Sequence, residues 1–150
     1  MDRRQLLKLA GIAIVLLTTP PAFAGKAQIF TGLVDGVAVA GYDPVSYFSG
    51  TPLVGKPEIS TTWNGAEWRF SSEENKATFT AAPEKYAPQY GGYCAFAVSK
   101  GATAKGDPEA WTVTDGKLYL NFSKGVREQW QTDIPGNVSA ANSNWPKVLE

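Results

Sequence analysis

The chain has 150 residues, with 14 Lys and Arg against 14 Asp and Glu, so its formal net charge at pH 7 is zero. This balance excludes the strongly basic surface that binds nucleic acid or anionic lipid. The sequence holds no His, one Cys and one Met. Zinc, copper and iron–sulfur sites draw three or four ligands from these residue types, and a disulfide needs two Cys. One chain therefore builds neither a soft-metal site nor an internal disulfide.

The first 24 residues have the organisation of a cleavable export signal. A positively charged start is followed by an apolar run over 9–17, and Ala22-Phe23-Ala24 is a small-x-small cleavage pattern. The run is too short to span a bilayer stably, which favours a signal over a membrane anchor. Arg3-Arg4-Gln5-Leu6-Leu7-Lys8 resembles the twin-arginine motif, although a general secretory signal can also carry two arginines. We expect export by one of these machineries, cleavage by signal peptidase near Ala24-Gly25, and a periplasmic protein without a stable membrane span.

Short elements are predicted ahead of residue 60. Val34–Ala40 has the pattern of a strand interrupted by a turn. Asp43 can cap a short helical segment within 41–50, because Pro44 suits the first helical position. Residues 50–58 combine prolines with glycines and are predicted to form a loop.

A hairpin and a helix are predicted next. Strand-forming residues flank the favoured two-residue turn Asn64-Gly65 in Thr61–Phe70. Ser71 and Glu74 form a capping box, and the helix that begins there should end before Pro83.

The second part of the chain predicts a similar series. Cys94–Val98 has the pattern of a buried strand, and Ser99–Ala110 that of a loop. Trp111–Phe122 is a second hairpin with its turn at Asp115-Gly116, and Ser123 can cap the helix after it.

The overall order predicts a single α+β domain over residues 25–150. It contains two short antiparallel hairpins with helices packed on one side, and a last helix broken near Trp145-Pro146. Hairpin, Phe-Ser and helix occur twice, but these two copies align only with a one-residue slip. The repeat is therefore weak evidence for an internal duplication.

Several motifs in this order resemble a YHS domain. They are GYDPVSYF, the segment WNGAEWRFSSEENKATFTAAPEKYA, and then YGGYCAFAVS, GDPEAW, DGKLYLN and NWPKVL. Their spacing is similar to that of a group of small exported bacterial YHS proteins, and the likeness covers nearly all of residues 25–150. Metal-handling YHS members carry Cys at the positions of Ser46, Ser71 and Asn75. Ser and Asn bind soft metals poorly, so the resemblance implies the scaffold without its metal site.

Two main interpretations of Cys94 are open. The exported YHS group keeps a Cys in this motif, and some members are described as carrying selenocysteine there, so the resemblance implies a reactive thiol. The residues themselves favour a small buried side chain, because no His and no CxxC partner is present to activate the thiol. An intermolecular disulfide is a further alternative.

Ligand binding is predicted for aromatic residues and one carboxylate in or beside glycine-containing loops. The candidates are Tyr42, Asp43, Tyr47, Tyr90, Tyr93 and Trp111. The five tryptophans could line a pocket for a flat ligand such as haem or a quinone, although Trp at strand and helix spacing usually belongs to a core.

The sequence therefore predicts an exported binding or accessory domain for a small ligand or a periplasmic protein partner. The first alternative is a thiol-dependent oxidoreductase with Cys94 as its catalytic residue. The second is a metal-handling protein that takes ligands from another chain. No particular cofactor is indicated, and no loop of regularly spaced carboxylates indicates a calcium site.

Overall fold

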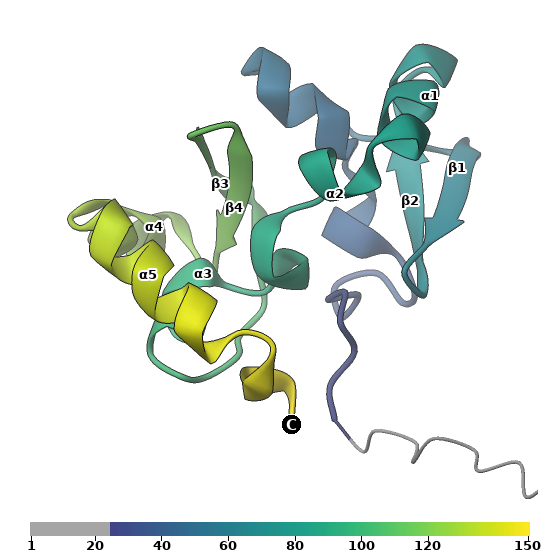
Figure 1. Cartoon of the computed structure of the whole chain (residues 1–150). Helices are drawn as coiled ribbons and strands as arrows, with labels where there is room; N and C mark the ends of the chain where they lie inside the picture. The colour runs from purple at the N-terminus through teal and green to yellow at the C-terminus, as the bar shows by residue number, and fades with distance from the viewer. Residues whose placement is uncertain (1–24) are drawn as a thin grey trace, which may run out of the picture.

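The computed structural model of the chain describes residues 25–150 (Figure 1). The predicted signal, its cleavage site and its export motif lie outside these residues. The elements are η1 (Ala38–Gly41), η2 (Pro44–Ser49), β1 (Lys56–Trp63), β2 (Ala66–Phe70), α1 (Glu73–Ala81), α2 (Pro83–Tyr86), η3 (Gln89–Gly92), α3 (Ala95–Ser99), β3 (Asp107–Thr114), β4 (Lys117–Asn121), α4 (Lys124–Gln131), α5 (Ile134–Asn144) and η4 (Lys147–Leu149).

The α+β prediction is confirmed. β1 pairs with β2 and β3 pairs with β4, each as a separate antiparallel two-stranded sheet. Figure 1 shows α1 beside the first sheet, α4 beside the second, and α2 on the connection between them, while α5 packs against α3 and α4. Within residues 25–150 no helix has the length and apolar character needed to cross a membrane.

The start of the first sheet differs from the prediction. Val34–Ala40 contains the predicted turn at Asp35-Gly36, between the bridged residues Val34 and Val37. It is not a regular strand, because Val39 and Ala40 adopt left-handed backbone with φ of 53° and 51°. Such backbone cannot continue an extended chain, and this segment instead contains isolated bridges followed by η1. β1 also begins at Lys56, inside the segment predicted to be a loop, although the Asn64-Gly65 turn is where the sequence places it.

The cap of α1 is Ser72 rather than Ser71. Ser72 Oγ accepts a hydrogen bond from the Asn75 amide at 3.1 Å. Ser71 cannot take this role because its hydroxyl donates to the buried carboxylate of Asp43 at 2.7 Å. The predicted capping box is therefore wrong, whereas the predicted end of the helix before Pro83 is correct.

The segment after Cys94 is a helix and not a strand. Tyr90 and Gly91 have φ of 57° and 64°, which turns the chain sharply before Cys94. Cys94 then caps α3, with Sγ accepting from the Ala97 amide at 3.5 Å. β3 likewise begins within the predicted loop, at Asp107.

The two hairpin units repeat each other in detail. Asp43 and Cys94, Gly65 and Gly116, and Ser72 and Ser123 all lie 51 residues apart. Left-handed backbone occurs at 39–41 and again at 90–92, and both sheets have a register shift at the corresponding place. Asp43 N–H donates to Leu53 O at 2.8 Å, and Cys94 N–H donates to Ala104 O at 3.0 Å. We call residues 38–81 the first repeat and 89–131 the second. The one-residue slip between the two sequence copies arises when Phe70-Ser71 is matched with Phe122-Ser123. In the structure, Ser72 and not Ser71 is equivalent to Ser123.

Two hydrophobic cores meet at β4. Leu118 and Leu120 are buried in the core that contains Trp68 and Phe79 of the first repeat. Tyr119, between them in sequence, packs in the other core against Trp130, with 5.1 Å between the ring centroids. Because alternate residues of a strand face opposite sides, β4 contributes to both cores.

Candidate functional site

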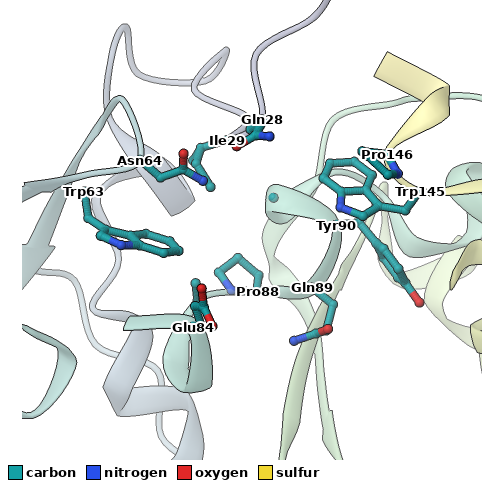
Figure 2. Close-up of a pocket in the computed structure, with 12 residues that line it drawn as sticks. Gln28, Ile29, Trp63, Asn64, Glu84, Pro88, Gln89, Tyr90, Trp145 and Pro146 are labelled. Carbon is teal, nitrogen blue, oxygen red and sulfur yellow. The ribbon is translucent and has the colours of Figure 1, made fainter. Parts of the chain in front are cut away.

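A cleft of about 220 Å³ lies between the two repeats (Figure 2). It is lined by Gln28, Ile29, Trp63, Asn64, Glu84, Ala87, Pro88, Gln89, Tyr90, Gly91, Trp145 and Pro146. These residues come from the start of the described chain, the β1–β2 turn, α2, η3 and the end of α5. Tyr90 is a predicted ligand-binding residue, and Trp63 and Trp145 belong to the five tryptophans for which the sequence offers both a pocket lining and a core role.

Gly91 holds one wall of the cleft in place. Phe30 N–H donates to Gly91 O at 2.9 Å, which fastens residues 28–30 across η3. A Cβ at Gly91 would overlap the carbonyl oxygen of Gln28, and its φ of +64° favours glycine. The close crossing of the two backbones therefore requires glycine at this position.

Two half-buried indoles stand on opposite sides of the cleft (Figure 2). The Trp63 ring packs edge-on against Phe79, with the centroids 5.9 Å apart at 86°. The Trp145 ring packs against Tyr90 at 6.0 Å and against Tyr93 at 6.1 Å. Core residues thus orient both indoles while leaving part of each in the cleft.

The polar groups of the cleft are mainly neutral. Tyr90 donates its hydroxyl to Asn142 Oδ1 at 2.9 Å, and burial raises the pKa of Tyr90 above its ordinary value, which keeps the hydroxyl protonated. The amides that line the cleft are those of Gln28, Asn64 and Gln89, and its one charged lining residue is Glu84. An aromatic, weakly acidic cleft suits a planar ligand that carries hydrogen-bond donors or a positive charge.

Three of the other predicted ligand residues gather elsewhere. Tyr42 and Trp111 line a separate pocket of about 300 Å³. Tyr47 lies behind Trp111, fully buried, with its ring edge-on at 5.6 Å. The structure thus brings these three aromatic residues together at a place distinct from the cleft.

Asp43, which is also a predicted ligand-binding residue, is buried and lines neither of these pockets. Its side chain is 0 % exposed, and its carboxylate accepts from the amides of Val45 and Ser71, the hydroxyl of Ser71 and the side-chain amide of Asn75. Ser46 Oγ donates to the main-chain carbonyl of Asp43 at 2.6 Å. The positions that the YHS resemblance aligns with metal ligands therefore meet at one place, where they form a hydrogen-bonded cluster.

Cys94 and Tyr93 are also packed in the interior. The Cys94 thiol is 1 % exposed and donates to Asn121 Oδ1 at 3.6 Å. The Tyr93 hydroxyl donates to Ala27 O at 2.7 Å and so anchors the start of the described chain. Within residues 25–150 no three side chains of His, Cys, Asp or Glu come together as a metal site would require.

A test of Cys94 follows from its burial. In the folded protein we expect maleimide or peroxide to modify Cys94 about a hundredfold more slowly than in denaturant, because the reagent needs a local opening. The measurement is the time course of modification by mass spectrometry at neutral pH, with and without urea. Rapid reaction of the folded protein, together with a folded Cys94→Ser variant, would instead support a reactive thiol.

The chain has no match among known proteins in the three comparisons: no family model, no curated protein and no solved structure matches it. The resemblance to YHS domains therefore remains a prediction from the sequence motifs.

Proposed function

We propose that the protein is an exported YHS-like binding domain that holds a small planar ligand in the cleft between its repeats. The observation that carries the proposal is the placement of Trp63 and Trp145, two half-buried indoles on opposite sides of one cleft (Figure 2). Trp68 and Trp130, in contrast, are completely covered by the two cores.

The size of the cleft limits the ligand. Sites for drug-sized ligands occupy roughly 300–1,000 Å³, and this cleft has about 220 Å³. It suits a ligand with one or two fused rings. Stacking on an indole contributes about 0.5–1.5 kcal/mol beyond the buried area, and the side-chain amides can fix the orientation of the rings.

The indoles can be tested with quinoline as a probe of one bicyclic ring system. Titration of ¹⁵N-labelled protein should shift the indole N–H signals of Trp63 and Trp145. Trp63→Leu and Trp145→Leu should each weaken binding by about tenfold, because each variant loses one stacking face while keeping an apolar side chain.

Phe122→Leu is the matched control, since Phe122 is an exposed aromatic residue outside the cleft. It should leave the affinity for quinoline unchanged. The proposal fails if quinoline moves neither indole signal, or if both Trp variants bind as well as the original chain while remaining folded.

A further inference from the structure

We infer that the pocket beside Trp111 is a second binding site, independent of the cleft, and that it takes a small zwitterion of the α-amino acid class. The pocket has a volume of about 300 Å³. Tyr42 and Pro52 line it from the first repeat, while Pro108, Glu109, Trp111 and Lys124 line it from the second.

The aromatic wall of this pocket is fixed in advance. The Tyr47 hydroxyl donates to Pro108 O at 2.7 Å, which ties the first repeat to β3. The Tyr47 ring supports Trp111 from the core side at 5.6 Å, and the Arg127 guanidinium lies 6.0 Å from the Trp111 ring centroid. A ligand would therefore meet an indole that needs little rearrangement to bind.

Charges of both signs surround this wall. Glu109 lies beside Tyr42, and the pKa of Tyr42 is raised first by burial and then by the Glu109 carboxylate. Lys124 and Arg127 follow one turn apart on α4, and Arg127 Nε donates to Thr112 Oγ1 at 3.1 Å. Within residues 25–150 the one ion pair joins Arg69 to Glu67, so none of these three charged groups has an ionic partner there.

A pocket that is lined by both a carboxylate and an ammonium group suits a zwitterion. The ligand carboxylate would lie toward Lys124, and the ligand ammonium would lie toward Glu109. Hydrogen bonds between oppositely charged groups are stronger than those between neutral groups, so both ends of the ligand contribute to affinity. A ligand with only one charge would leave the other side of the pocket without a partner.

The two repeats can be compared at the positions of Trp111 and Lys124. The residues equivalent to Trp111 and Lys124 in the first repeat, 51 positions earlier, are Ser60 and Glu73. The first repeat forms the same elements with a small hydroxyl and with the opposite charge. Lys124 is therefore a feature of this pocket and not of the repeated scaffold, whereas Trp111 lines the pocket and also packs against the core of the first repeat.

Three probes with the same ring test the charge requirement: L-phenylalanine, phenethylamine and 3-phenylpropanoate. We expect L-phenylalanine to shift the Trp111 indole signal, assigned with Trp111→Phe, and to bind about tenfold more tightly than either singly charged probe. The Trp111 response to L-phenylalanine should persist in the Trp63→Leu and Trp145→Leu variants, which separates this site from the cleft.

Two exposed charges provide the variants. Glu109→Gln should weaken L-phenylalanine about tenfold and leave 3-phenylpropanoate unchanged, whereas Lys124→Gln should weaken both of these ligands and leave phenethylamine unchanged. The controls are Glu58→Gln, at the equivalent position of the first repeat, and Lys117→Gln on β4. The inference is overturned if no probe moves the Trp111 signal, if the anion binds as tightly as the zwitterion, or if the controls weaken binding equally.

Discussion

Asp43→Ala is expected to destabilise the protein by roughly 3 to 5 kcal/mol. The carboxylate is fully buried and accepts four hydrogen bonds from η2, the end of β2 and α1. Removing it leaves buried donors of Val45, Ser71 and Asn75 without their acceptor. Urea denaturation, followed by circular dichroism, measures the change in the free energy of unfolding.

Asp133→Ala is the matched control. Asp133 also caps a helix, but it is exposed and accepts from the Gly136 amide alone, at 3.0 Å. Loss of such a cap costs about 1 kcal/mol. Equal losses for the two variants would show that the Asp43 cluster does not stabilise the fold beyond ordinary capping.

Gly91→Ala should cost about 3 kcal/mol or more and disturb the cleft. The added methyl group would collide with the Gln28 carbonyl, and the left-handed backbone adds a penalty of its own. We expect residues 28–30 to move away from η3, which should lower both the free energy of unfolding and the affinity for quinoline.

Gly116→Ala separates the effect of the steric collision from the effect of the left-handed backbone. Gly116 has a similar φ of +70°, but no atom lies within 4 Å of the position that a Cβ would take. This variant should cost about 1 kcal/mol and leave the cleft unchanged. If Gly91→Ala behaves in the same way, the close crossing at Gly91 does not restrict the side chain.

Local chemistry explains which elements the sequence predicts. The turns at Asn64-Gly65 and Asp115-Gly116 and the cap at Ser123 depend on neighbouring residues, and they are correct. The cap at Ser71 fails because a carboxylate 28 positions earlier takes its hydroxyl. The strand predicted after Cys94 fails because the left-handed backbone of Tyr90 redirects an apolar run that periodicity alone cannot classify.

The cleft could not be predicted in the same way. Its lining residues are far apart in the sequence and meet because the two repeats pack against each other. Examples are Gln28, Trp63, Glu84 and Trp145. The sequence supplied one signal, its five tryptophans, and Trp at strand and helix spacing usually belongs to a core. Tyr42, Tyr47 and Trp111 were easier to find because they lie in or near loops that the motifs already marked.

The position of β4 has a consequence for how the protein unfolds. Its leucines complete the core of the first repeat, while Tyr119 belongs to the core of the second. Pulling this strand out would expose both cores to water at once, so neither repeat is an autonomous folding unit. The two repeats share the same arrangement of elements, but we expect them to unfold together as one cooperative domain.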